Sequence, residues 1–205
     1  MTGTRDFNAA AATWDEEPRR LKMADSVARA IRETIPLSPE MDVLDFGCGT
    51  GLLTLRLHPF VRSSTGIDTS QGMLDVLDGK VRDQKISGVT TEIADIENGK
   101  LPAGTYDLIV SNMTCHHVRD IGTVISRLAT LLRPDGILAI ADLDSDEGKF
   151  HDTNDGVFHF GFDRCAMKKY FENAGICSIR NRTAAIMVKP SGTFTVFLMT
   201  GVKPE

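Results

Sequence analysis

The stretch from Val43 to Gly51, which reads VLDFGCGTG, limits the possible folds more than any other part of the chain. Short apolar residues run into an acidic residue, and glycines then follow at alternate positions. Glycine tolerates positive φ angles and lets another molecule approach the backbone closely, so a strand can end here in a sharp turn. The stretch therefore predicts a strand followed by a loop that holds a nucleotide-type cofactor.

Short apolar runs alternate with helical patterns around this loop. We expect helices at residues 51–58, at 70–83 with Ser70 as N-cap, and from Val118 to Leu132 before the break at Arg133-Pro134-Asp135-Gly136. We expect strands at residues 41–46, 64–68, 89–94, 107–111 and 137–142. Alternating strands and helices favour right-handed crossovers and a parallel sheet covered on both faces. The predicted fold is a doubly wound α/β domain.

The two ends of the chain extend this pattern. Residues 1–36 form an N-terminal helical extension, in which apolar residues recur at helical spacing from Pro18 until Pro36 stops them. Residues 145–162 are polar and predict a long loop that acts as a lid or substrate loop. A helix from Asp163 to Ala174 is closed by Gly175, and runs at 177–188 and 193–202 predict an antiparallel hairpin. We expect residues 1–205 to form a single domain.

The spacing of the glycines narrows the choice of cofactor. The dinucleotide fingerprint is Gly-x-Gly-x-x-Gly, but here Gly47, Gly49 and Gly51 alternate and Leu52 takes the place of the last glycine. Asp68 ends the next predicted strand, where a carboxylate can accept hydrogen bonds from both hydroxyls of an adenosine ribose. Enzymes that use NAD share this acidic residue, so Asp68 alone does not decide the cofactor.

Several further motifs follow in order. Gly66-Ile67-Asp68, Ala94-Asp95-Ile96, the strand from Tyr106 to Ser111, and Leu132 to Gly136 come after the glycine loop. Together they resemble the successive motifs of class I S-adenosylmethionine-dependent methyltransferases over roughly residues 40–142. The resemblance implies a Rossmann-like fold with a seven-stranded, mostly parallel sheet, and S-adenosyl-L-methionine as cofactor.

The resemblance also implies cofactor roles for particular residues. The backbone at Gly47, Cys48 and Gly49 would approach the methionine part of the cofactor, and Asp45 would lie near its amino group. Asp68 and Thr69 would be at the ribose. The remaining cofactor-binding residues are then Met73 near the adenine, Asp95 and Ile96 at the adenine amino group, and Ser111 below the sulfonium. Met73 as core filling, Asp95 as a turn residue and Asp68 as an acidic residue at the N-terminus of the helix near Ser70 are the structural alternatives.

Candidate catalytic residues follow the fourth predicted strand, where an open α/β sheet binds its ligands. His116 and His117 titrate near neutral pH and could remove a proton from the methyl acceptor; capping or core packing is the alternative for both. His151 and His159 lie in the expected lid, but no tight ligand spacing indicates a metal site. Trp14 either closes the acceptor pocket or fixes the first helix.

Composition bears on partners and location. The net charge is −5 and basic residues are scattered, which argues against a nucleic-acid partner. The four cysteines form no Cys-x-x-Cys pair, and neither a signal peptide nor a membrane-spanning segment is evident, so we expect a cytoplasmic protein. We predict an enzyme that methylates an O or N atom of a small molecule. The alternatives are a cofactor-binding sensor or adaptor, a nucleic-acid or protein methyltransferase, and a nicotinamide-dependent oxidoreductase.

Overall fold

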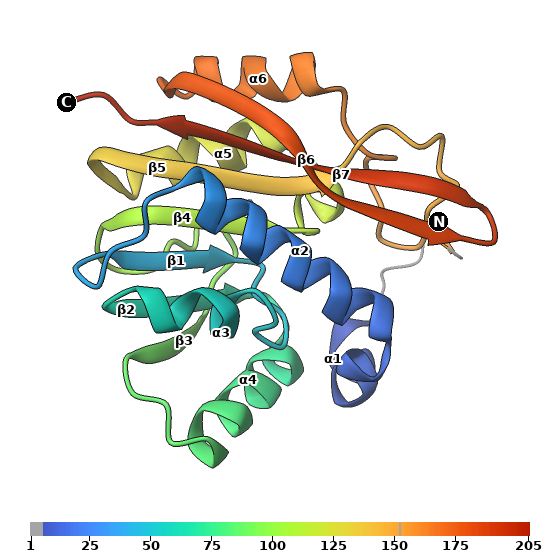
Figure 1. Cartoon of the computed structure of the whole chain (residues 1–205), viewed down its shortest axis with the longest axis horizontal. Helices are drawn as coiled ribbons and strands as arrows, with labels where there is room; N and C mark the ends of the chain where they lie inside the picture. Colours follow the sequence, from blue (N-terminus) through green and yellow to red (C-terminus); the bar gives the residue numbers. More distant parts are fainter. Residues whose placement is uncertain (1–5, 152) are drawn as a thin grey trace.

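The computed structural model describes residues 6–151 and 153–205 and is built around one seven-stranded sheet (Figure 1). The strand order is β3-β2-β1-β4-β5-β7-β6, and only β7 runs antiparallel to its neighbours. The strands are β1 (Asp42–Phe46), β2 (Ser63–Asp68), β3 (Val89–Ile93), β4 (Tyr106–Asn112), β5 (Leu132–Leu143), β6 (Cys177–Lys189) and β7 (Gly192–Val202). The predicted mostly parallel sheet with a C-terminal antiparallel hairpin is confirmed.

Helices and short helical turns connect the strands. They are α1 (Phe7–Ala10), η1 (Ala11–Glu16), α2 (Pro18–Thr34), α3 (Thr54–Leu57), η2 (His58–Phe60), α4 (Gln71–Asp83), η3 (Cys115–His117), α5 (Ile121–Thr130) and α6 (Arg164–Asn173). Ser70 and Asp163 cap α4 and α6, as predicted. Three details differ from prediction: α3 is only one turn, α5 starts after its cap Asp120, and the run from Arg133 to Gly136 lies inside β5 at a shift in register.

Alternation along the central strands divides the core between the two faces of the sheet. Val43 and Leu108 face one side, where they pack with α2 and α3. Leu44 and Ile109 face the other side, where they pack with α5 and α6. Residues of a strand point alternately to opposite faces, so these continuous apolar runs are buried on both sides. The carboxyl ends of the strands remain available for a site.

The segment that precedes α2 lies against the carboxyl end of this sheet. Within α1 and η1 only Ala11 is buried, so the segment is held mainly by polar contacts. The Asn8 Oδ1 atom accepts hydrogen bonds from Ser70 Oγ at 2.9 Å and from the Gly72 backbone N–H at 2.8 Å. Asp15 accepts a hydrogen bond of 2.6 Å from Thr50 Oγ1 and forms an ion pair with Lys80. The segment is therefore fastened to the glycine loop and to the start of α4.

Residues 145–162 contain turns and bends but, where they are described, no helix or strand. The backbone N–H groups of Phe158 and His159 both donate to the His116 carbonyl, at 2.9 and 3.2 Å. These bonds hold the loop beside η3. None of the helices in the described part of the chain has the length and apolar character that a membrane crossing requires.

Candidate functional site

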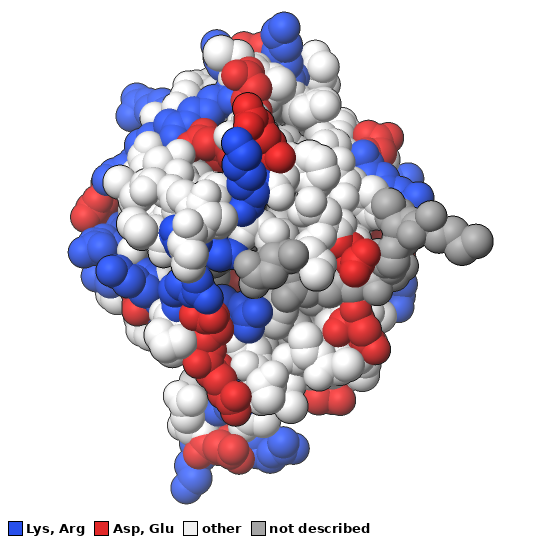
Figure 2. Space-filling view, turned by 90° about the vertical axis from the view of Figure 1, so that its right-hand side faces the viewer, with Lys and Arg blue, Asp and Glu red and all other residues white. Residues whose placement is uncertain are grey.

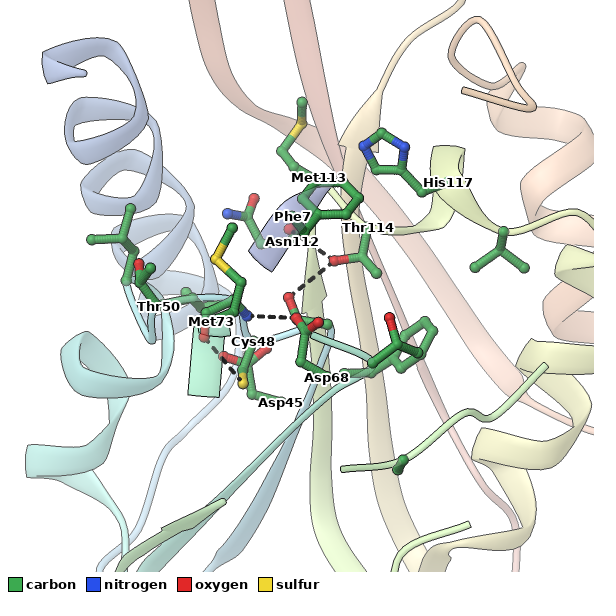
Figure 3. Close-up of a pocket in the computed structure, with 18 of the residues that line it drawn as sticks. Phe7, Asp45, Cys48, Thr50, Asp68, Met73, Asn112, Met113, Thr114 and His117 are labelled. Atoms are coloured by element: carbon green, nitrogen blue, oxygen red, sulfur yellow. Dashed lines mark hydrogen bonds between the residues drawn. The ribbon is translucent and has the colours of Figure 1, made fainter. Parts of the chain in front are cut away.

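A cavity of about 370 Å³ opens where β1, β2 and β4 end. Its walls combine the glycine loop, the ends of β2 and β4, residues 94–98, η3 and the N-terminal segment. Figure 3 shows Asp45, Cys48 and Asp68 on one side of this space and Met113 and His117 on the other. Strand order reverses between β1 and β4, and open α/β sheets bind their ligands at such a switch point.

The glycine loop needs its glycines for two different reasons. Gly47 has a φ of +68°, and a Cβ atom there would lie 2.2 Å from Thr114 Cγ2. Gly49 has a φ of +54°, but a Cβ atom there would meet only Met73 Sδ, at 3.9 Å. At Gly51 a Cβ atom would lie 2.3 Å from Leu77 Cδ1 in α4. Gly51 thus allows the close approach of helix and loop that the third glycine of a dinucleotide fingerprint provides.

Cys48 lies in this loop, and its environment disfavours the reactive thiolate form. Its thiol is buried against Gly66, where a Cβ atom would lie only 2.8 Å from the sulfur. Burial, together with the nearby carboxyl groups of Asp45 and Asp68, raises the pKa of the thiol well above its usual value. Since the thiolate is the reactive form, this environment disfavours Cys48 as a nucleophile.

Asp45 is a buried carboxyl group beneath the loop. Its Oδ2 atom accepts a hydrogen bond of 2.6 Å from Thr54 Oγ1. Burial raises the pKa of Asp45 to about 7; the bond from Thr54 opposes this shift, and repulsion from Asp68 adds to it. The pocket therefore contains an acidic group that would gain from a positively charged or hydrogen-bond-donating ligand.

Asp68 lies at the end of β2 and binds the loop directly. Its Oδ2 accepts from the Gly49 N–H and its Oδ1 from the Ser70 N–H, both at 2.9 Å. Burial raises the pKa of Asp68, although these backbone donors oppose the shift. Thr69 and Met73 line the cavity beside it, and the Met73 side chain is almost fully buried.

Asp95 and Ile96 form a third part of the wall. The two carboxylate oxygens of Asp95 accept from the Asn98 N–H at 3.1 Å and from Asn98 Nδ2 at 2.7 Å. Asp95 thus closes a turn and lines the cavity at once. Ile96 is buried, and its carbonyl accepts a hydrogen bond of 2.6 Å from Arg127.

The structure places Ser111 and His116, two predicted site residues, outside the cavity lining. Ser111 is buried within the sheet, where its hydroxyl donates to the Phe46 carbonyl at 2.9 Å, because the alternation of β4 turns this position away from the cavity. His116 is buried beside Asp142, with 2.7 Å between His116 Nδ1 and Asp142 Oδ1. Burial alone would raise the pKa of Asp142, but the His116 ring outweighs that effect and the pKa lies below its ordinary value. This pair supports the loop and the end of β5.

His117 does line the cavity. Its Nδ1 lies 2.7 Å from the Gly156 carbonyl, and its ring meets the Phe7 ring edge-on with 5.1 Å between centroids. A carbonyl oxygen only accepts hydrogen bonds, so in the neutral imidazole the proton sits on Nδ1. The lone pair is then on Nε2, which suits a proton acceptor.

The remaining aromatic and histidine candidates divide between the cavity and the loop. Trp14 lines the cavity and also fixes α2, because its carbonyl accepts from Arg20 at 2.8 Å and its ring lies under the Arg20 guanidinium. His151 and His159 are outside the lining; the His151 ring centroid lies 4.9 Å from that of His116. No group of three His, Cys, Asp or Glu side chains in residues 6–151 and 153–205 is arranged to hold a metal ion.

Sequence reasoning did not single out Phe7, Arg20 or Asn112, which also line the cavity. Phe7 belongs to an N-terminal stretch with little pattern, and Arg20 lies on the predicted helix that begins at Pro18, whose position relative to the cavity only the fold shows. Asn112 follows Ser111, the last residue of the predicted strand. It could have been identified as a cavity residue if the sequence showed which residue at this strand end points to the cavity.

A family model described as "Methyltransferase domain" matches residues 16–187. The chain belongs to the class I S-adenosylmethionine-dependent methyltransferases. Among curated relatives in this family, an uncharacterized methyltransferase of Schizosaccharomyces pombe is 36% identical over 151 residues, covering 66% of this chain and 53% of the relative. A malonyl-[acyl-carrier protein] O-methyltransferase of Bacillus anthracis is 31% identical over 170 residues, covering 82% of this chain and 59% of the relative. The chain thus spans only about half the length of the curated relatives it matches.

Solved structures of methyltransferases share the fold at low sequence identity. One chain of the complex between the Haloferax volcanii Trm112 methyltransferase activator and a putative methyltransferase has a TM-score of 0.76 and 18% identity, with 99% of this chain and 100% of that chain covered. Phosphoethanolamine N-methyltransferase 2 of Haemonchus contortus, in complex with S-adenosyl-L-methionine, has a TM-score of 0.72 and 16% identity, with 87% and 52% covered.

Proposed function

We propose that this chain transfers a methyl group from S-adenosyl-L-methionine to an oxygen or nitrogen atom of a small molecule, and that the cavity beneath the N-terminal segment holds both reactants. One observation carries the proposal: the glycine loop, two buried carboxyl groups and His117 line the same cavity. When bound, the cofactor supplies an activated methyl group on sulfur. The residues of the chain bind and orient the two reactants and exclude water from them.

The residues present fit the cofactor. The raised pKa values of Asp45 and Asp68 indicate carboxyl groups that lack enough compensating charge or hydrogen bonds, and such groups mark functional sites. An amino group near Asp45 and ribose hydroxyls at Asp68 would supply the missing partners. The open space at Gly49 lets the methionine part approach the backbone, with Cys48 turned inward. Thr69 would lie beside the ribose, and Met73, Asp95 and Ile96 would enclose the adenine.

The acceptor lies on the other side of the cavity. His117 takes the proton of the nucleophile at Nε2 while its Nδ1–H stays bonded to the Gly156 carbonyl. Phe7 and Trp14 form an aromatic cover from the N-terminal segment. Residues 145–162 act as the second cover, since they contact both His117 and the His116 carbonyl. Together these parts hold the reactants in line and keep water out.

A small acceptor is favoured over a nucleic acid. On the face shown in Figure 2, groups of Lys and Arg side chains are interrupted by Asp and Glu side chains, whereas nucleic-acid binding uses a continuous basic surface. Relatives of similar sequence include enzymes named for malonyl-[acyl-carrier protein] and for nocamycin. These names support a metabolite or a carrier-bound metabolite as acceptor.

The test is methyl transfer from labelled S-adenosyl-L-methionine to a metabolite extract. We expect labelled small-molecule products with the wild-type chain. We also expect Asp68→Ala to weaken binding of S-adenosylhomocysteine by about tenfold or more in calorimetric titration, because a hydrogen bond to a charged group contributes about 1.5–3 kcal/mol and about 1.4 kcal/mol is a factor of ten. Asp75→Ala, an exposed aspartate of α4, is the matched control.

Three results would argue against this function. Cofactor binding without any product would identify a sensor or adaptor. If a whole-cell extract replaced the metabolite extract, label in RNA, DNA or the amino-acid side chains of a protein alone would identify a macromolecular acceptor. Unchanged affinity in the Asp68→Ala variant would remove the ribose assignment.

A further inference from the structure

Asn112 presents a buried polar atom that the protein does not satisfy. The residue ends β4 and lines the cavity (Figure 3), and its Oδ1 atom is buried without a hydrogen-bond partner among the described residues. Buried acceptors of this kind are nearly always paired, since leaving one unpaired is costly. Other polar groups at the end of β4 are paired: the Asn112 carbonyl accepts from Thr114 Oγ1 at 3.3 Å, and the Met113 N–H donates to the Ala141 carbonyl at 2.9 Å.

The backbone next to Asn112 is held in an unusual conformation. Met113 has a φ of +57°, in the left-handed region that non-glycine residues seldom adopt. Thr114, which follows, also donates to the Gly47 carbonyl at 3.1 Å and thereby ties the end of β4 to the glycine loop. Strain of this kind persists where the surroundings fix the chain, and it concentrates at functional sites. The backbone that carries the Asn112 side chain is therefore held in place at the cavity wall.

We propose that Asn112 Oδ1 accepts a hydrogen bond from the nucleophile of the methyl acceptor, and that the acceptor is consequently an amine or a hydroxyl compound rather than a carboxylate. An amine or hydroxyl carries the N–H or O–H that Oδ1 lacks, whereas a carboxylate at neutral pH would bring a second acceptor oxygen against it. This inference rests on the proposed methyltransferase function.

The transfer step is balanced with the groups at hand. The lone pair of the nucleophile forms the new bond to the methyl carbon, the sulfur–methyl bond breaks, and its electron pair stays on sulfur. The proton of the nucleophile passes to Nε2 of His117 and from there to solvent. Asn112 orients the nucleophile through its hydrogen, so that the lone pair points at the methyl group.

The experiment compares Asn112→Leu, which removes the acceptor at similar size, with Asn112→Asp, which keeps it. Products from labelled S-adenosyl-L-methionine and a metabolite extract are identified by mass spectrometry and their rates of formation compared. We expect methylated amines or methyl ethers, a loss of at least tenfold in rate for Asn112→Leu, and recovery of most of the rate for Asn112→Asp. Asn173→Leu, at the exposed end of α6, is the control.

Two measurements without turnover accompany this comparison. Binding of S-adenosylhomocysteine should change less than twofold in both Asn112 variants; a large loss in Asn112→Leu would assign Oδ1 to the amino group of the cofactor and overturn the proposal. The melting temperature of the ligand-free protein should not fall in Asn112→Leu, since the atom removed has no partner there. A fall of several degrees would show a structural role instead.

The remaining outcomes are equally decisive. Methyl esters as the products, with activity lost in Asn112→Asp, would show that the amide donates to a carboxylate and would overturn the proposal. Normal binding of S-adenosylhomocysteine with no labelled product from any variant would refute the proposed function itself, and this inference with it.

Discussion

Asp45 and Asp68 bring two buried carboxyl groups to the same cavity, and the protein compensates the charge of the two groups to different degrees. The charge of Asp68 is partly compensated by the N–H groups of Gly49 and Ser70, whereas Asp45 accepts from Thr54. Desolvation therefore dominates at Asp45, and its pKa rises to about 7. Ionisation of the buried Asp45 carboxyl group thus carries an electrostatic cost that a cationic ligand group would relieve.

This cost predicts a pH dependence of stability. With its folded pKa raised above the usual 3.8, Asp45 binds a proton in the folded but not the unfolded chain between pH 3.8 and about 7. The free energy of unfolding should therefore fall as pH rises through this window, by up to about 1.4 kcal/mol per pH unit, and not change further from this group above it. Asp45→Asn keeps an acceptor for Thr54 and removes the titration. In urea unfolding of the ligand-free protein, we expect the free energy of unfolding of this variant to rise relative to that of the wild type between pH 5 and pH 8.

The control for this measurement is Asp75→Asn on the exposed face of α4, which should track the wild type at every pH. A difference between Asp45→Asn and the wild type that is constant from pH 5 to pH 8 would show that Asp45 is charged throughout and is compensated by the protein.

At this scale the sequence predicted which motifs line the cavity but not which neighbouring residue faces it. Asp45, one residue before the end of β1, and Asp68, at the end of β2, follow from the resemblance of their motifs to those of class I methyltransferases. Whether Ser111 or Asn112 lines the cavity depends on which side of the sheet one strand position points to. Whether His116 or His117 lines it depends on the conformation of the short turn η3. A shift of one residue reverses the facing in a strand, so motif spacing could not decide either pair.

The N-terminal segment, α1 with η1, is the element whose role the sequence showed least. It has little apolar periodicity because it buries almost nothing of its own, and its position depends on contacts with Ser70, Gly72, Thr50 and Lys80. Partners so distant in the chain leave no local pattern. By contrast, α2, α4 and α6 were predictable because caps and helical spacing are local signals.

These contacts predict that the segment controls exchange of the cofactor. Asn8→Ala removes two hydrogen bonds to the start of α4, so we expect S-adenosylhomocysteine to dissociate roughly tenfold faster, given about 0.5–1.5 kcal/mol for each bond. Stopped-flow fluorescence is a direct measurement, since Trp14 lines the cavity and is the only tryptophan of the sequence.

Asn173→Ala, at the end of α6, should leave the dissociation rate as it is in the wild type. If Asn8→Ala released the ligand at the wild-type rate while the Trp14 signal still responded to binding, the segment would not limit exchange.

The residues that line the cavity come from parts of the chain that are far apart in sequence. They belong to the N-terminal segment, β1, β2, residues 94–98, β4 and η3, and the strands among these elements lie on both sides of the switch point in the sheet. A ligand that bridges these parts should stabilise the fold as a unit. The strand order and the hairpin were predictable from alternation and turn residues, because topology follows from rules that hold for all doubly wound sheets. The position of the N-terminal segment over the cavity was not predictable, because it depends on contacts between residues far apart in sequence.

Thermal unfolding should therefore distinguish the cofactors. At a concentration of one hundred times its Kd, S-adenosylhomocysteine should add about 2.7 kcal/mol to the free energy of unfolding and raise the melting temperature by several degrees. NAD at the same concentration should leave it unchanged, since Leu52 stands where the dinucleotide fingerprint has its last glycine. Stabilisation by NAD alone would contradict the assignment of the cavity.

The contact between Cys48 and Gly66 also constrains how this family member can change over generations. Any side chain at position 66 would meet the Cys48 sulfur at 2.8 Å, although the backbone of Gly66 is an ordinary strand. A Cβ atom at position 66 therefore has room only if the Cys48 side chain moves or becomes smaller. We expect Gly66→Ala to be better tolerated together with Cys48→Ala than alone, so the effects of the two substitutions on stability should not add.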